Sequence, residues 1–237
     1  MNLPDGLLDS TWVVVTWLLF VPFALHTLWY APWRPMANSG RFNTWLGLIV
    51  LLVLLWSMKA GVKPGLSLHL LGATVMTLCF GWRLAFVGLC LVLAAVSLNG
   101  DAGWESFAAN ALLMGGLSVI ASQAIYRATD RFLPQHFFVY IFANGFFAAG
   151  LTVIFVGLAS CLLLAGVDAY SLDYLFGEYL PYFMLLGFSE AWLSGMAITL
   201  FVVYRPDWVI TFGDAHYLTE PKKTPLRRPT HRNRRFK

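Results

Sequence analysis

The sequence predicts an all-α, polytopic membrane helical bundle with about seven transmembrane helices. Of its 237 residues, 59% are hydrophobic and only 12% are charged, whereas soluble domains carry about 25% charged residues. The apolar residues also form long runs, and a helix needs about 20 such residues to cross a bilayer. Composition and run length together exclude an ordinary soluble domain.

Seven apolar stretches are long enough to be considered as membrane spans. They are Thr11–Tyr30, Phe42–Met58, Leu66–Phe80, Leu84–Leu98, Phe107–Tyr126, Phe137–Val167 and Tyr179–Tyr204. The third and fourth are short and are separated by only three residues, which predicts a tight helical hairpin. We therefore expect a transmembrane domain over residues 1–210, followed by a basic tail over residues 211–237 that is predicted to be disordered.

The charged residues predict the orientation of the bundle. If the C-terminus is cytoplasmic, seven spans place the N-terminus outside. Of the 16 lysines and arginines, all except Lys59 and Lys63 then lie on the inner side, as the positive-inside rule requires. The outer loops are acidic, and they either concentrate cations near an entrance or are simply solvated. The chain is expected in the inner (plasma) membrane as a multi-pass protein.

An ionisable side chain, His69, lies at the start of the third apolar stretch. Ionisable groups at or inside a bilayer are costly and often mark a substrate, ion or proton path. A neutral imidazole is also the commonest metal ligand among side chains. The alternative is a histidine at a helix end whose polar tip reaches the membrane interface. His69 alone leaves both interpretations open.

Two further polar residues lie inside apolar stretches. Glu190 is a carboxylate within the last predicted span and is expected to face the bundle, either with a structural partner or in substrate binding or coupling. Asn110 lies in the fifth span, where an amide is more often an interhelical hydrogen-bonding group than a ligand. The candidate partners of the carboxylate are Ser189, Ser194 and Asn144.

Four segments of the chain resemble, in order, the motifs of a known membrane family. The opening Met1-Asn2-Leu3-Pro4-Asp5-Gly6-Leu7-Leu8 is similar to M-H-I-P-D-G-[FY]-L, and His69-Leu70-Leu71-Gly72-Ala73 is similar to H-L-[LI]-G-[GA]. Asn99–Gly103 with Ala108–Gly115 resembles G-D-G-G…G-A-N-x-x-x-M-G, and Glu190–Gly195 with Arg205–Asp207 resembles the last helix of the family. This family is the CbiM/NikM type, the substrate-capturing membrane component of cobalt and nickel energy-coupling factor ABC transporters.

The resemblance implies a metal site at the N-terminus. In the family, the N-terminal segment folds back into the outer half of the bundle and binds one divalent ion. Its ligands are the terminal amine, the backbone nitrogen and imidazole of residue two, and the histidine of the H-L-L-G segment. Here Met1, Asn2 and His69 occupy these positions. Four nitrogens in a plane suit Ni(II), so the implied substrate is transported Co²⁺ or Ni²⁺, without a permanently bound cofactor.

Asn2 departs from the family pattern, which has histidine at this position. A carboxamide oxygen is a harder and weaker donor for nickel or cobalt than an imidazole nitrogen. Three outcomes are therefore open: weaker binding of a transition ion, preference for another divalent ion or solute, or loss of transport. In the last case the chain would be an integral membrane interaction or assembly protein that keeps the fold.

The sequence contains no motif that could power transport. It has no G-x-x-x-x-G-K-[ST] phosphate loop and no H-E-x-x-H or G-x-S-x-G motif, so it is not expected to be an enzyme. The resemblance implies energy-coupling ATPase subunits and a coupling transmembrane subunit as partners. The basic tail is expected to contact anionic membrane lipids, at about 1 kcal/mol per basic residue near the surface, rather than nucleic acid.

Overall fold

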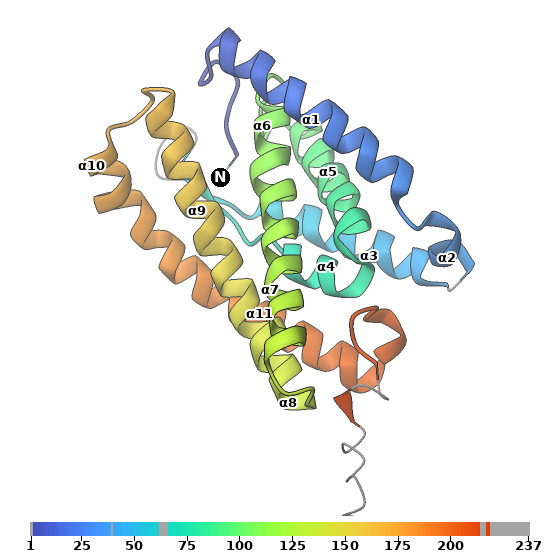
Figure 1. The fold of residues 1–237 in the computed structure, drawn as a ribbon. Helices are drawn as coiled ribbons and strands as arrows, with labels where there is room; N and C mark the ends of the chain where they lie inside the picture. The colour runs from blue at the N-terminus through green and yellow to red at the C-terminus, as the bar shows by residue number, and fades with distance from the viewer. Residues whose placement is uncertain (1, 39, 62–65, 214–216, 219–237) are drawn as a thin grey trace, which may run out of the picture.

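The structure, a computed structural model, is a bundle of helices and describes residues 2–38, 40–61, 66–213 and 217–218 (Figure 1). The first part of the chain forms α1 (Ser10–Tyr30), α2 (Trp33–Asn38), α3 (Arg41–Ser57), β1 (Ala60–Gly61), β2 (Ser67–Leu68), α4 (Ala73–Phe80) and α5 (Trp82–Leu98). α1 lies diagonally across the upper part of the bundle in Figure 1, where it contacts α5 and α6.

Three long helical rods complete the bundle, and each contains a stretch of wider π-helical winding. They consist of α6 (Phe107–Asn110), η1 (Ala111–Leu117) and α7 (Ser118–Phe132); α8 (Phe137–Val139), η2 (Tyr140–Phe147) and α9 (Ala148–Gly166); and α10 (Leu172–Tyr174), η3 (Leu175–Tyr179) and α11 (Leu180–Tyr204). A short 3₁₀ turn, η4 (Pro206–Trp208), follows. The second and third rods pack closely along α9 and α11, where Gly150 and Gly187 approach each other.

The described helices confirm the predicted all-α membrane bundle. Four of them are long and apolar enough to cross a membrane: Ser10–Tyr30, Phe107–Phe132, Phe137–Gly166 and Leu172–Tyr204. α3 and α5 have 17 residues each and are also apolar. Together with α4, these helices follow the seven predicted stretches in order. The last rod begins earlier than predicted, at Leu172 instead of Tyr179.

The third predicted span is helical only in its second half. Ser67 and Leu68 are extended and pair with β1 in antiparallel register, and α4 begins after Gly72. Gly72 has a φ of +66°, and a Cβ atom there would lie 2.2 Å from Leu52 Cδ2, so the position requires glycine. As a result, His69 lies in a non-helical segment between β2 and α4.

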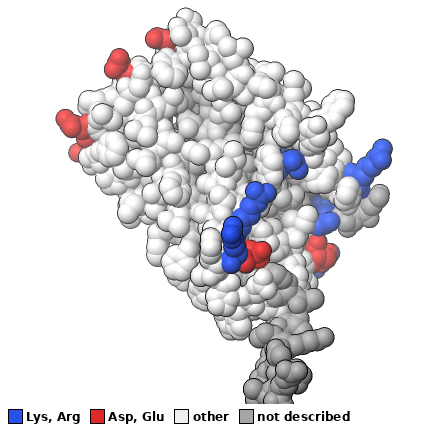
Figure 2. All heavy atoms as spheres, in the orientation of Figure 1, with Lys and Arg blue, Asp and Glu red and all other residues white. Residues whose placement is uncertain are grey.

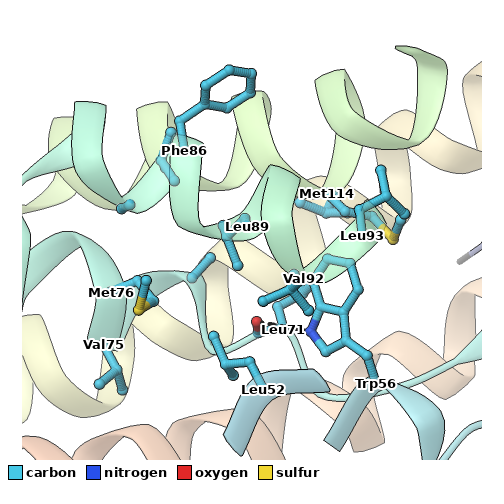
Figure 3. Close-up of a cluster of buried hydrophobic side chains, with 14 of the residues drawn as sticks. Leu52, Trp56, Leu71, Val75, Met76, Phe86, Leu89, Val92, Leu93 and Met114 are labelled. Carbon is cyan, nitrogen blue, oxygen red and sulfur yellow. Dashed lines mark hydrogen bonds between the residues drawn. The ribbon is translucent and has the colours of Figure 1, made fainter. Parts of the chain in front are cut away.

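The hairpin predicted between the third and fourth stretches is present. α4 and α5 pack against each other and are joined at Gly81, whose φ is +79°. All eight residues of α4 are buried, which explains why this helix carries no charged residue and has no solvent-facing polar side. Figure 3 shows the centre of this core, where Trp56 from α3 and Met76 from α4 are fully buried beside α5.

The two ends of the bundle differ in charge, in agreement with the predicted orientation. The start of α1 and the turn before α10 lie at the upper end in Figure 1, and α8 lies at the lower end. On the face shown in Figure 2, acidic side chains line the upper left edge, while the basic side chains lie at the lower right with a few acidic ones among them.

The chain continues to pack on the bundle beyond the domain boundary predicted at residue 210. Phe212 and Tyr217 are buried, and both rings contact Tyr140. The backbone N–H groups of Ile210 and Thr211 donate to the carbonyls of Cys79 and Leu78 at the end of α4. These bonds satisfy helix-end carbonyls that have no partner within the helix. Residues 219–237 of the predicted tail lie outside the described residues.

Candidate metal site

The segment from Asn2 to Leu8 runs from the start of α1 back into the bundle, as predicted (Figure 1). Gly6 has a φ of +77° in the turn that reverses the chain. Leu3 is only 1% exposed, and Asn110 holds its backbone from both sides. The amide oxygen of Asn110 accepts from Leu3 N at 2.9 Å, and its Nδ2 donates to Leu3 O at 3.1 Å. Asn110 is therefore a hydrogen-bonding group for the N-terminal segment.

The turn before α6 forms hydrogen bonds with the outer part of the N-terminal segment. Asp5 Oδ1 accepts from Glu105 N at 2.8 Å, and Ser106 Oγ donates to Pro4 O at 2.9 Å. Gly103 N donates to the Leu3 carbonyl at 3.3 Å. A Cβ atom on Gly103 would lie 2.1 Å from Asp5 Oδ1, so glycine is required for this close approach.

The returning segment brings Asn2 against His69. Asn2 Oδ1 lies 3.0 Å from His69 Nε2, and the two residues are 5% and 2% exposed. Asn2 Nδ2 donates to the Asp101 carbonyl at 3.4 Å, which turns the amide oxygen towards the imidazole. The backbone N–H of Asn2 donates to Ser67 Oγ at 3.1 Å. Two of the three predicted metal-site residues therefore meet in the structure, and Met1 lies outside the described residues.

The second ring nitrogen of His69 and one face of its imidazole ring also have partners. Nδ1 lies 3.1 Å from the Leu70 carbonyl, and the ring packs against Trp56 with the centroids 4.6 Å apart. Metal-binding histidines commonly donate their other ring N–H to such a carbonyl, which leaves a lone pair for the ion. With the proton on Nδ1, the Nε2 lone pair of His69 faces Asn2.

The spacing of the two facing atoms suits a shared cation. In that tautomer, His69 Nε2 and Asn2 Oδ1 both present lone pairs to each other, and a cation between them would accept both. Two ligand atoms at about 2.1 Å from one ion and at right angles to each other are about 3.0 Å apart. The observed separation is also 3.0 Å. In the other tautomer, Nε2–H donates directly to Asn2 Oδ1.

The site is poor in the usual ligand types. Within the described residues, no group of three or more His, Cys, Asp or Glu side chains is arranged to hold a metal ion. The two potential ligand atoms that meet are Asn2 Oδ1 and His69 Nε2, and the family resemblance implies the Asn2 backbone nitrogen as a further ligand. The backbone nitrogen carries a proton that is donated to Ser67, so its use as a ligand requires loss of that proton and of that hydrogen bond.

Lys59 and Asp101 form an ion pair next to this site that the sequence analysis did not identify. Lys59 Nζ lies 2.6 Å from Asp101 Oδ1 and donates to the Asp101 carbonyl at 3.0 Å. Hydrogen bonds from Lys59 and from Asn99 Nδ2 lower the pKa of the Asp101 carboxyl group. The carboxylate offsets the positive charge of Lys59 beside the candidate cation site. A lysine and an aspartate 42 residues apart carry no local signal of this pairing.

Glu190 faces the bundle and reaches the segment that carries His69. Its two carboxyl oxygens accept from Leu71 N at 2.8 Å and from Gly72 N at 2.7 Å, and Ser194 Oγ donates to it at 3.2 Å. The prediction of Ser194 as a partner is confirmed. The other two candidates are engaged elsewhere, Ser189 with a backbone carbonyl of its own helix and Asn144 with a threonine of α7.

The fold is that of a multi-pass membrane protein with its N-terminal segment buried in the bundle. The chain belongs to the CbiM family, described as "Cobalt uptake substrate-specific transmembrane region", which matches residues 2–208. No curated protein matches the chain.

Two solved structures share the fold. One, described as "Crystal Structure of an Truncated Transition metal Transporter", has a TM-score of 0.75 and 17% identity, and the match covers 86% of this chain and 99% of that chain. Another, described as "Crystal Structure of an transition metal transporter", has a TM-score of 0.72 and 17% identity, with coverage of 84% and 92%. At this identity the likeness supports the fold alone.

Proposed function

We propose that this protein is the substrate-capturing membrane component of an energy-coupling factor transporter for a divalent transition-metal ion, cobalt or nickel. The observation that carries the proposal is the convergence of Asn2 Oδ1 and His69 Nε2, 3.0 Å apart in a buried position near the outer end of the bundle. The family assignment supports metal uptake, and the geometry supports these two residues as ligands. Met1 is proposed as a third ligand through its terminal amine.

The proposed ligand set should bind Ni²⁺ and Co²⁺ more weakly than a set of four nitrogen ligands. Asn2 contributes an amide oxygen where the family has an imidazole, and oxygen donors favour harder ions than Ni(II). We expect this chain to bind Co²⁺ and Ni²⁺ more weakly than a variant with histidine at position 2.

Energy for transport is proposed to come from partner subunits. The sequence lacks a nucleotide-binding motif, so ATP hydrolysis is assigned to separate ATPase subunits and its transmission to a coupling transmembrane subunit. The inner leaflet of the plasma membrane would supply the anionic lipids for the basic tail.

A second function is favoured by one observation, the asparagine at position 2. Its side chain already hydrogen bonds to His69 and to the Asp101 carbonyl. These contacts satisfy the site without an ion, as expected of an integral membrane interaction or assembly protein that has kept the fold.

Calorimetry on the purified full-length protein with its native N-terminus separates the two functions. Under the transport proposal, Ni²⁺ or Co²⁺ binds to the wild type, binding is lost in His69→Ala, and Asn2→His binds more tightly. The gain should vanish in the Asn2→His, His69→Ala double variant. Binding that appears only in Asn2→His would favour the non-transporting function, and equal affinity of wild type and Asn2→His would remove Asn2 from the ligand set.

A further inference from the structure

Glu190 does not touch the candidate ligands, yet it contacts the backbone on which one of them is carried. We propose that Glu190 is a positioning residue for His69: its carboxylate fixes residues 71–72 and thereby orients the imidazole towards the ion. The proposal rests on the proposed function and adds a residue from the last helix, 119 positions from its partner Leu71.

The carboxyl group of Glu190 lies at a helix N-terminus, where its oxygens act as acceptors. Two backbone N–H groups and the hydroxyl of Ser194 donate to it. Gly72 is the residue directly before α4, where the first N–H groups of a helix have no partner within the helix. The helix dipole also favours a negative charge at this end. The side chain therefore fixes the point at which α4 begins.

Two routes of contact lead from residues 70–72 to His69. The carbonyl of Leu71 accepts from the Trp56 indole N–H at 3.2 Å, and the indole packs on the imidazole at 4.6 Å between ring centroids. Figure 3 shows Trp56 and Leu71 side by side in the core. The carbonyl of Leu70 faces His69 Nδ1 at 3.1 Å. The peptide units after His69 thus bind the carboxylate on one side and hold the imidazole on the other.

The substitution Glu190→Gln tests this arrangement with little change in volume. A glutamine has one carbonyl oxygen, so it can accept from Leu71 N or from Gly72 N, and its NH₂ group would face the other N–H. One buried backbone donor then loses its acceptor, and the segment must shift. Groups that orient a metal ligand without touching the ion commonly change metal affinity by about 10- to 100-fold when they are removed.

The matched control is Asn144→Leu. Asn144 is 2% exposed, as is Glu190, and its side chain bonds to Thr129. The control therefore also removes a buried polar contact between helices, but one that does not involve residues 69–72. A purely structural role of Glu190 predicts that both variants lower the melting temperature and leave His69 unchanged.

Two readouts on the full-length protein decide between these roles. One is the nickel affinity and the d–d absorption band of bound Co²⁺. The other is the ring ¹⁵N resonances of His69 in the metal-free protein, assigned by their absence in His69→Ala. We expect Glu190→Gln to weaken nickel binding by about tenfold or more, to move the cobalt band and to shift or broaden the His69 resonances, while Asn144→Leu changes none of these.

The proposal is overturned if Glu190→Gln folds and retains both the nickel affinity and the His69 resonances of the wild type. If Glu190→Gln does not fold, Glu190→Asp and Trp56→Phe take its place, since each removes one of the contacts that connect Glu190 to His69. Wild-type nickel affinity and wild-type His69 resonances in both variants would also overturn the proposal. A wild type that binds neither nickel nor cobalt refutes the proposed function, and the metal-free resonances still decide whether Glu190 positions His69.

Discussion

The substitution Asn110→Leu should loosen the N-terminal segment without opening a cavity, because leucine has the same branched shape as asparagine, with methyl groups in place of the amide oxygen and nitrogen. Asn110 is fully buried and bonds to both the N–H and the carbonyl of Leu3. In the variant, the Leu3 carbonyl keeps the bond from Gly103 N. The Leu3 N–H has no second acceptor among the described residues, so it is left buried and unpaired.

The cost of that unpaired donor sets the expected magnitude. A buried N–H without an acceptor costs about 1–3 kcal/mol, and a middle value of about 2 kcal/mol corresponds to about a 30-fold change in the equilibrium between docked and released segment. Amide hydrogen exchange, followed by mass spectrometry on a peptide covering residues 2–8 in the metal-free protein, measures this equilibrium directly. We expect exchange in this peptide to be faster by about 30-fold in Asn110→Leu.

Asn144→Leu provides the control, since Asn144 is a second buried asparagine whose partner is Thr129 rather than the N-terminal segment. Its exchange in residues 2–8 should match the wild type. If Asn110→Leu folds and its residues 2–8 exchange at the wild-type rate, Asn110 does not hold the segment and the reasoning is refuted.

Three further predictions concern topology and the N-terminus. A reporter fused after Lys237 should be active only in the cytoplasm and one inserted at Leu172 only outside, and cytoplasmic activity at Leu172 would contradict the orientation. Residues added before Met1 should abolish nickel or cobalt binding because they remove the free amine and displace the segment, so unchanged calorimetry in the extended protein would exclude Met1 as a ligand. Gly103→Ala should increase hydrogen exchange of the N-terminal segment because its Cβ atom would overlap Asp5; a wild-type exchange pattern would show that this approach can relax.

The helices were predictable because the length and hydropathy of apolar runs depend on local sequence alone. α1, α3 and α5 begin and end within two residues of their predicted bounds. The non-helical segment before α4 was not predictable in this way. Residues 66–71 are mostly leucine, so their hydropathy does not distinguish them from the membrane helix that follows. What separates the two conformations is the left-handed backbone of Gly72 and the side chain of Leu52 packed against it.

The candidate site was also predictable only in part. The pairing of Asn2 with His69 followed from the resemblance to the family. The roles of Asn110 and Glu190 were missed in detail because their partners are backbone groups. A backbone N–H or carbonyl is present at every ordinary residue, so no residue type marks it as a partner across more than 100 positions.

The contacts of the N-terminal segment also determine when the site can exist during synthesis. Asn2 and Leu3 are synthesised before their partners, which lie 67 and 107 positions later in the chain. The segment that carries His69 in turn binds Glu190 in the last membrane helix. The complete set of contacts can therefore form only after the last helix has been inserted. Capture of an ion at this site would then be restricted to chains whose last helix is already in place.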